Sequence, residues 1–399
     1  MAPPDAALAA LDPDAIARDT ASLVRIASLT GEERPALELL AELADGLGLR
    51  ADLHRHELEA LRSHPDHPGE EAPRVELWGL AVTLPGRDPG GPRIALDGHV
   101  DVVGPGNERW TRDPWSGERS GGFVHGRGSA DMKGGVVAAL HALGAIARTE
   151  GAALGEVVLL AVGSEEDGGL GTFAALERDD RFDACLIPEP TGFDVVCAQA
   201  GALTFTGVVR GRGAHAALRL HGDSAIDRYL SIHTALAAHE RRLNTHVEHP
   251  LMRELELPYP ISVGRLEAGT WSSAVPDLLR FEGRVGVRLG EHPDAARAAL
   301  EDACGGAEIA WTGGAFHPGE TDPGHPWVRR VLEAAVVDGD PRVVGVPYGT
   351  DLRLFTARGI PTVLCGTGGI ERAHAVDERV AEADLHRLAR IVVRALAGP

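Results

Sequence analysis

Short apolar runs bounded by glycine, proline or charged residues alternate with helical stretches along most of the chain. Strand-like runs occur at 94–96, 157–162 and 184–187, and an alanine- and leucine-rich helix is expected at 134–148. Each such element must bury an apolar face against another, so the alternation favours an α/β sheet with helices on its faces. A chain of 399 residues has room for two or three domains.

The pattern changes to alternating polar and apolar segments after about residue 201 and returns to the α/β type after 311. The segments that carry this change are 203–209, 261–266 and 279–287 with a helical stretch at 224–242, then helices at 326–337 and 382–396 with a strand at 362–365. We therefore predict an α/β catalytic domain with a mixed sheet, formed by residues 1–200 and 312–399. A smaller α+β domain is inserted over 201–311.

The charge of the chain excludes several partners. The 39 basic and 59 acidic residues leave a net charge of -20, which repels nucleic acid and anionic lipid, so neither is expected as a partner. The N-terminus lacks the pattern of a signal peptide, and no apolar stretch is long enough to cross a membrane. The four cysteines form no Cys-x-x-Cys pair, which fits a reducing compartment, and we expect a cytoplasmic protein.

The stretch 54–73 carries four histidines, which raises the possibility of a metal site. Their irregular spacing among proline, aspartate and glutamate favours a solvated surface loop instead.

A histidine and an aspartate follow the first strand-like run. The strand 94–97 continues into Gly98-His99-Val100-Asp101, at the sheet edge where open α/β folds place their ligands. On an extended chain, His99 and Asp101 point the same way, and a metal-binding imidazole needs an acceptor such as Asp101 on its second nitrogen. An ordinary surface pair is the alternative.

A glycine-rich segment, 126–135, lies directly before the expected helix at 134–148. It differs from a dinucleotide loop because Asp131 stands where the third glycine is required, and its carboxylate would repel a pyrophosphate. Asp131 is therefore either a helix cap or a residue that bridges two metals.

Further carboxylates and one histidine follow other strand-like runs. Glu165 and Glu166 follow 157–162, Glu189 follows 184–187, and His374 follows the strand at 362–365. With His99 and Asp131, they make two imidazoles and four carboxylates with no thiolate, a donor set that suits a dinuclear zinc or cobalt site. Motifs for phosphate-binding loops, His-Glu-x-x-His metalloproteases and serine hydrolases are absent.

These five motifs, together with Trp110-Thr111-Arg112-Asp113-Pro114, resemble the M20 metallopeptidase family in their order from about residue 22 to 395. The family includes acetylornithine deacetylases, succinyl-diaminopimelate desuccinylases, aminoacylases and glutamate carboxypeptidases. The resemblance implies that the inserted domain is a dimerisation (lid) domain.

The resemblance also implies roles for individual residues. One divalent ion would be bound by His99, Asp131 and Glu189 and a second by Asp131, Glu166 and His374, with zinc expected and cobalt as the alternative. Asp101 would orient His99, Glu165 would be the general base, and the Asp131-Met132 peptide would be cis. His215 of one protomer in a homodimer would help bind the oxyanion in its partner's site.

The substrate-binding positions depart from the family pattern. Ser273 stands where an asparagine is common, and the family's carboxylate-binding arginine falls near Gly286, where Arg284 or Arg288 could replace it. Thr350 and Arg353 lie in a segment that resembles a pocket-lining one.

The predicted function is metal-dependent hydrolysis of an amide, which removes an N-acyl group from an amino acid or related small carboxylate as an acetylornithine deacetylase does. A water between the two ions would attack, with Glu165 as base. A dipeptidase or carboxypeptidase of the same superfamily, acting on a short peptide, is the alternative. A non-catalytic binding protein is disfavoured because every ligand position is filled.

Overall fold

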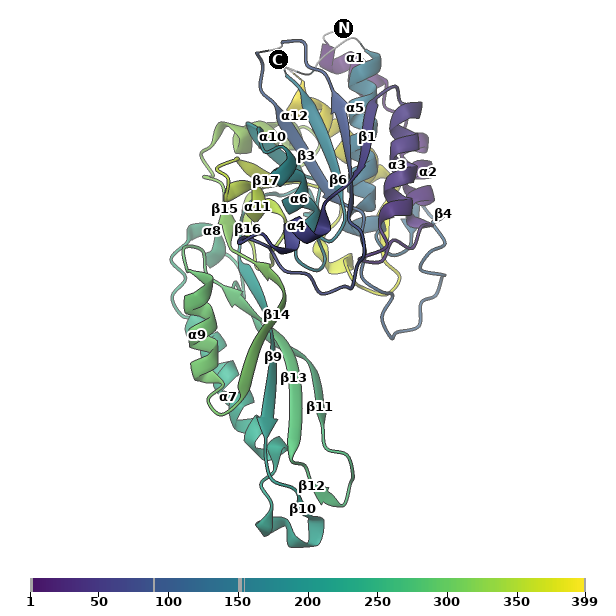
Figure 1. The fold of residues 1–399 in the computed structure, drawn as a ribbon. Helices are drawn as coiled ribbons and strands as arrows, with labels where there is room; N and C mark the ends of the chain where they lie inside the picture. Colours follow the sequence, from purple (N-terminus) through teal and green to yellow (C-terminus); the bar gives the residue numbers. More distant parts are fainter. Residues whose placement is uncertain (1–2, 89, 150–152, 154, 398–399) are drawn as a thin grey trace. The chain divides into compact units, whose positions relative to one another are not determined.

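The computed structural model describes residues 3–88, 90–149, 153 and 155–397 (Figure 1). The chain forms two compact units. The first comprises Met1–Cys197, Glu320–Val344 and Leu354–Pro399, and the second comprises Ala198–Gly319 and Gly345–Arg353. Within the described ranges, no helix combines the length and the apolar character needed to cross a membrane.

The first unit is built on a mixed sheet with the strand order β1-β2-β6-β3-β7-β17-β8-β15, and β16 pairs with β8. Its strands are β1 (Arg50–Arg55), β2 (Trp78–Leu84), β3 (Ile94–His99), β6 (Val157–Val162), β7 (Ala184–Ile187), β8 (Val195–Gln199), β15 (Gly319–Glu320), β16 (Val343–Val346) and β17 (Thr362–Leu364). Strand β3 runs parallel to β6 and β7, and β17 runs parallel to β7. The carboxyl ends of these strands therefore meet at one edge of the sheet.

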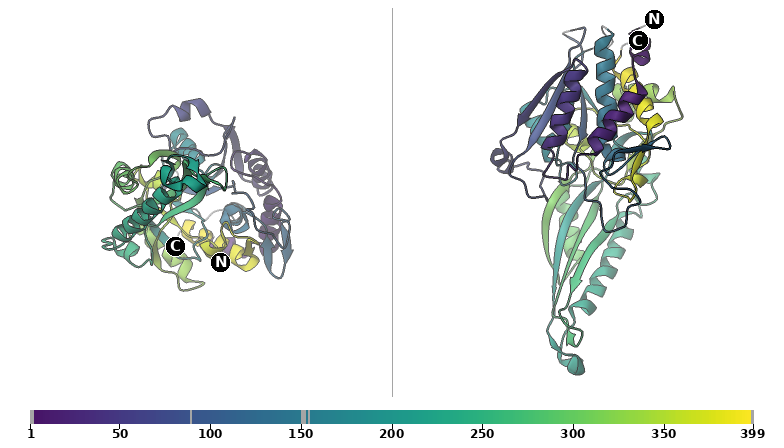
Figure 2. Two further views of the ribbon diagram at one scale, coloured as in Figure 1. Left: turned by 90° about the horizontal axis from the view of Figure 1, so that it is seen from below. Right: turned by 90° about the vertical axis from the view of Figure 1, so that its right-hand side faces the viewer.

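Helices cover both faces of this sheet (Figures 1 and 2). One face is covered by α2 (Pro13–Val24), α3 (Arg34–Gly46), α5 (Gly134–Arg148) and α12 (Glu382–Leu396). Every residue of α5 from Gly134 to Ile146 is buried, which explains its nearly uniform apolar sequence. On the opposite face, α6 (Leu170–Arg178) is fixed by Thr172, whose hydroxyl donates to the buried Asp97 carboxylate of β3.

Short elements complete the first unit. They are α1 (Pro3–Ala9), α4 (Leu58–Arg62), α10 (Pro326–Val336), the π-helical turn η1 (Ser129–Lys133), the 3-10 turn η3 (Ile370–Arg372), and a three-stranded sheet of β4 (Glu118–Ser120), β5 (Phe123–His125) and β18 (Arg379–Ala381) in the order β18-β5-β4. Helix α11 (Leu352–Thr356) begins in the second unit and ends in the first.

The second unit is a four-stranded antiparallel sheet with helices on one face. Its elements are β9 (Gly201–Arg210), β10 (Ala214–His215), η2 (Ala216–His221), α7 (Ala225–Leu243), α8 (Pro250–Arg253), β11 (Ile261–Ala268), β12 (Ala274–Val275), β13 (Leu278–Val287), α9 (Pro293–Ala303) and β14 (Glu308–Phe316). The sheet order is β11-β13-β9-β14. Alternate residues of β9 are buried, as the period-two pattern predicts for a sheet covered on one side.

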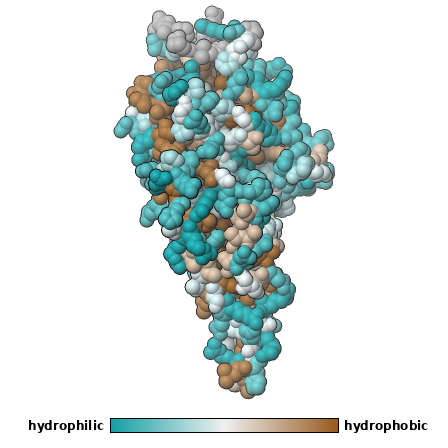
Figure 3. Space-filling view, turned by 90° about the vertical axis from the view of Figure 1, so that its left-hand side faces the viewer, coloured by the Kyte–Doolittle hydropathy of each residue, from teal (hydrophilic) through white to brown (hydrophobic). Residues whose placement is uncertain are grey.

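Aromatic rings link the sheet of the second unit to α7. The ring centroids of Phe205 and Phe281 are 6.0 Å apart, and Tyr229 of α7 lies 5.2 Å from Phe281. The end of this unit that carries β10 shows apolar residues at its surface (Figure 3), where Leu218 and Leu220 are 58% and 96% exposed.

The predicted mixed α/β fold is confirmed, and the helix at 134–148 and the strand at 157–162 have the predicted bounds. The prediction of a solvated loop over 54–73 is wrong for its first part, because His54 belongs to β1, α4 follows, and His56 is buried, whereas residues 63–73 form an irregular segment. The rings of His54 and His56 pack edge to face with centroids 4.7 Å apart. Burial lowers the pKa of His56 to about 4, so it is accommodated as a neutral imidazole.

Candidate metal centre

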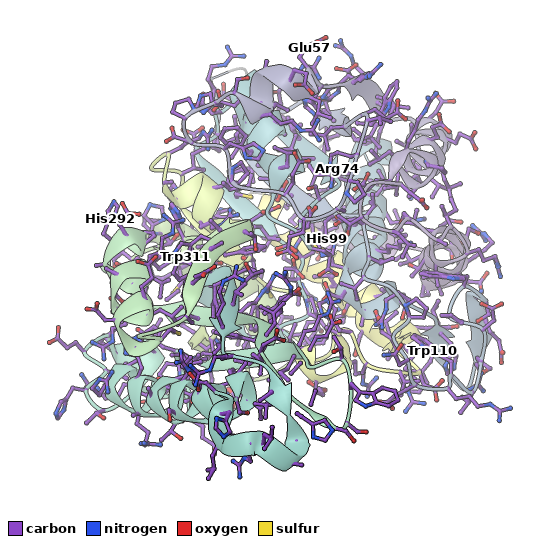
Figure 4. The ribbon with its side chains drawn as sticks, turned by 60° about the horizontal axis from the view of Figure 1, so that its bottom comes forward. Glu57, Arg74, His99, Trp110, His292 and Trp311 are labelled. Atoms are coloured by element: carbon purple, nitrogen blue, oxygen red, sulfur yellow. The ribbon has the colours of Figure 1, made fainter. Side chains whose placement is uncertain are left out.

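His99 is the last residue of β3 and is only 2% exposed. Its Nε2 lies 3.1 Å from Asp131 Oδ1 and 3.7 Å from Glu189 Oε1 (Figure 4 labels His99). Its Nδ1 lies 2.9 Å from the backbone carbonyl oxygen of Asp101. A carbonyl oxygen can only accept, so Nδ1 carries a proton, and Nε2 is the ring nitrogen that faces the carboxylates.

The Asp101 carboxylate holds the neighbouring acidic loop as well as His99. It lies 3.6 Å from His99 Nδ1 and accepts hydrogen bonds from the backbone N–H groups of Glu165 and Glu166, each at 3.2 Å. The Thr30 hydroxyl donates to it at 3.0 Å. One buried carboxylate thus connects the end of β3 to the loop after β6.

Asp131 lies between two imidazoles. Its Oδ1 faces His99, and its Oδ2 lies 3.6 Å from His374 Nε2. The Asp131-Met132 peptide is cis, as predicted. Gly98 of β3 permits the close approach of this turn, because a Cβ there would lie 2.9 Å from the methyl carbon of Met132.

Glu166 and His374 complete the site from two loops. Oxygens of the Glu166 carboxylate lie 3.0 and 3.1 Å from His374 Nε2. His374 follows η3, has a left-handed backbone with φ of 58°, and has a side chain that is 51% exposed. Glu165 and Glu189 are buried residues at the ends of the segments that follow β6 and β7.

The electrostatics of the cluster depend on carboxylate and imidazole pairs. Burial disfavours a charged His99, yet hydrogen bonds to Asp101 and Asp131 raise the pKa of His99 well above its usual value. Burial raises the pKa of Glu166, and the nearby Asp131 charge adds to this effect. The hydrogen bond to Glu166 raises the pKa of His374. Carboxylates this close together require positive charge among them.

The donor atoms fit a divalent metal ion. His99, Asp131 and Glu166 each offer one ligand atom, and these atoms all lie within 4.8 Å of one another. Nitrogen and carboxylate oxygen donors without thiolate suit zinc or a similar ion in a catalytic site.

A buried ionic network behind the acidic loop was missed from the sequence. Arg74 donates to Glu33 and to Asp167, and Asp167 also accepts from the Ser164 hydroxyl and the backbone N–H of Ala72. Asp167 adjoins Glu165 and Glu166 in the sequence, and that acidic run was the available signal. The ion pair between Arg127 and Glu378 was also missed, and no pattern in the sequence marks it.

The predicted substrate-binding residues and His215 belong to the second unit. The guanidinium carbons of Arg284 and Arg353 lie 5.6 and 4.6 Å from the centroid of the Phe316 ring. Arg288 donates to the backbone oxygens of Arg242 and Leu243, at the end of α7.

The remaining positions make local hydrogen bonds. The hydroxyl of the buried Thr350 donates to Gln199 Oε1 at 2.6 Å, and the backbone oxygen of Ser273 accepts from Ala216. A Cβ at Gly286 would lie 2.8 Å from Tyr259 Cα, so an arginine does not fit at this position without movement of the backbone.

A mixed α/β sheet with imidazoles and carboxylates gathered at its carboxyl edge is the architecture of a metallohydrolase. The chain belongs to peptidase family M20/M25/M40, whose family model matches residues 95–398. Proteins of this family hydrolyse amide bonds.

Known relatives and structures agree with this assignment. The chain is 30% identical over 397 residues to a protein of Rhodospirillum centenum named succinyl-diaminopimelate desuccinylase, with 95% of each chain covered. Its fold matches the di-peptidase Dug1p of Saccharomyces cerevisiae with a TM-score of 0.77 at 13% identity, over 99% and 98% of the two chains. It also matches the Bacillus subtilis YXEP protein, described as a dinuclear metal binding peptidase, with a TM-score of 0.60 at 17% identity, over 96% and 98%.

Proposed function

We propose that the protein removes an N-acyl group from an amino acid or related small carboxylate. The observation that carries this proposal is the convergence of His99, Asp131 and Glu166 at the edge of the sheet. The relatives named desuccinylase support a deacylase, and they favour succinyl over acetyl as the acyl group.

The proposed cofactor is a pair of divalent ions, zinc or alternatively cobalt. His99, Asp131 and Glu189 would hold one ion, and Asp131, Glu166 and His374 the other. Two such ions polarise a substrate carbonyl and lower the pKa of water at the site toward about 7.

Glu165 is the proposed general base. Its backbone is held by Asp101 and the residue is only 8% exposed, so its carboxylate is positioned with little solvent around it. Glu165 would accept a proton from the attacking water and pass it to the departing nitrogen. Asp101 is the proposed orienting residue for both His99 and this loop.

Arg284 and Arg353 are the proposed anchors for the substrate carboxylate. Their guanidinium groups are gathered around the ring of Phe316, whereas Arg288 is engaged by the end of α7. Thr350 and Ser273 are proposed as neighbouring polar contacts. Replacement of either anchor should raise KM for substrates that carry a carboxylate.

We further propose a homodimer in which His215 of one protomer serves its partner's site. His215 Nδ1 accepts from the Ala217 N–H at 3.1 Å, which leaves Nε2–H to donate to an oxyanion. The exposed Leu218 and Leu220 beside it suit a surface that a second chain covers. Mixing inactive His215→Ala and Glu165→Gln proteins should restore activity if the site is shared, and a fully active His215→Ala protein would contradict this.

The test of the proposed function is a substrate panel with the zinc- or cobalt-loaded protein. N-succinyl and N-acetyl amino acids and dipeptides would be compared by kcat/KM. Preference for an N-acyl amino acid supports the deacylase. Preference for dipeptides would assign the alternative peptidase function, and full activity after complete removal of metal would exclude both.

A further inference from the structure

A fully buried ion pair lies behind the metal centre. Arg127 and Glu378 are 2% and 1% exposed, and Arg127 Nη1 donates to Glu378 Oε2 at 2.6 Å. Arg127 precedes the turn η1 that carries Asp131, and Glu378 lies between His374 and β18. The pair thus joins two segments that are far apart in the sequence and that each supply a metal-binding side chain.

Glu378 binds the backbone of the segment that carries Asp131. Its Oε1 accepts from the N–H groups of Ala130 at 2.9 Å and Asp131 at 3.2 Å. These N–H groups belong to η1, where the backbone at Asp131 is non-helical, with φ of −119° and ψ of 100°, so they lack the regular partners that a helix supplies.

Arg127 binds the backbone of the segment that carries His374. Its Nη2 donates to the carbonyl oxygen of His374 at 3.1 Å, and its Nη1 donates to that of Ala375 at 3.3 Å. The guanidinium also lies 5.2 Å from the ring of Trp110, which is labelled in Figure 4. The planar fork of arginine makes these contacts together with the bond to Glu378, which a lysine cannot do.

From these contacts we infer that Arg127 and Glu378 are positioning residues that set the separation of Asp131 and His374. The inference rests on the proposed two-metal function. Two ions are proposed above. Only the ion held by Asp131, Glu166 and His374 takes a ligand from each of the two segments that the pair joins. Both ions use Asp131, but only this ion also uses His374, so loss of the pair should weaken its binding more than that of the ion held by His99, Asp131 and Glu189.

The experiment follows cobalt binding to the metal-free protein by visible absorption. In Arg127→Lys and Glu378→Gln, we expect the second equivalent of cobalt, the ion held by Asp131, Glu166 and His374, to bind about 10- to 100-fold more weakly. Other residues that support metal ligands have effects of this size. The first equivalent should stay within about threefold of wild type. His374→Ala serves as the reference, because it removes a ligand from the same ion and should produce the same change in a stronger form.

The matched control is Arg394→Gln, which breaks another ion pair of the first unit, between α12 and Asp338. Thermal unfolding of all metal-free variants separates loss of stability from loss of positioning. If the control lowers the melting temperature as much as the test variants and also weakens the second equivalent, the pair has only a structural role. Glu378→Asp, which keeps the charge and one bond, replaces Glu378→Gln if the latter does not fold.

The remaining outcomes separate this inference from the proposed function. Unchanged second-ion affinity in both variants, with two ions bound by wild type, would overturn the positioning role and leave the function intact. Failure of the wild-type protein to bind a second ion would instead contradict the two-metal function.

Discussion

His99 and His374 are the two histidines of the proposed metal centre, yet the protein holds them in different ways. His99 ends a central buried strand, and its Nδ1 is fixed by the backbone of Asp101. His374 lies in a loop with a left-handed backbone, and half of its side chain is exposed. Strand β3 holds His99, whereas the backbone of His374 accepts a hydrogen bond from Arg127.

This difference divides the site into a buried half around His99 and an exposed half around His374. The buried half has its donors in place through strand pairing, so it loses little entropy when an ion binds. The exposed half depends on a loop that water can reach. We expect the His374 half to bind its ion more weakly and to be the half that a substrate approaches.

The largest effect is expected for Asp131→Ala, which removes the carboxylate that faces both imidazoles. Both halves should lose metal together, and turnover should fall by more than the roughly 10⁴-fold upper limit for loss of a general base. Elemental analysis and kcat measurements check this. Retention of one tightly bound ion would show that the two halves are independent of Asp131.

Glu165→Gln should lower kcat by about 10² to 10⁴ while both halves keep their metal. The amide preserves the size of the side chain but cannot accept the proton. Metal content of the purified variant is the control. Wild-type turnover would move the role of base to another residue.

The two halves can be compared directly through the free energy of unfolding of the metal-free variants His99→Ala and His374→Ala. Loss of His99 leaves buried carboxylates without their partner, so the free energy of unfolding should fall by about 3 kcal/mol. Loss of His374 removes the partner of Glu166, but the imidazole is half exposed and water can replace it, so the free energy of unfolding should fall by only about 1 kcal/mol. Urea unfolding measures both. Equal losses would refute the distinction between a buried and an exposed half.

The same division explains what could be predicted from the sequence. His99, Glu166 and Glu189 follow apolar runs that become fully buried parallel strands, and the rule that such strands end at one edge brings their side chains together. The same rule placed His374 after the strand at 362–365, and the family resemblance then implied which ion each residue would bind. Local pattern and fold rule agreed wherever a strand carries the ligand.

The supporting residues could not be predicted because no local pattern marks them. Glu378 meets Arg127 across 251 residues of chain, next to strand β18, which pairs with β5. His54 and His56 were assigned to a solvated loop for a similar reason. Their polar surroundings suggested exposure, whereas pairing of β1 with β2 and packing of the two rings bury His56 and partly bury His54.

The smallest effect is expected for Asp101→Asn, which tests how far the buried half depends on its supporting carboxylate. An asparagine oxygen can still accept from Glu165 or Glu166, but its NH₂ group would face the other N–H, so one of the two bonds is lost. We expect metal affinity to fall by about 10- to 100-fold.

The fall should be confined to the half that contains His99 if the Asp101 carboxylate acts mainly on that imidazole. It should extend to the second ion if the carboxylate acts mainly through the loop that carries Glu166, to whose N–H groups it is hydrogen-bonded. Cobalt titration resolves the two steps, and Thr30→Val is the matched control because it removes a single donor to the same carboxylate. The Asp101 carboxylate lies closer to the loop N–H groups than to His99 Nδ1, so we expect the affinity for both ions to fall. An effect on the first ion alone would show that the loop does not depend on Asp101.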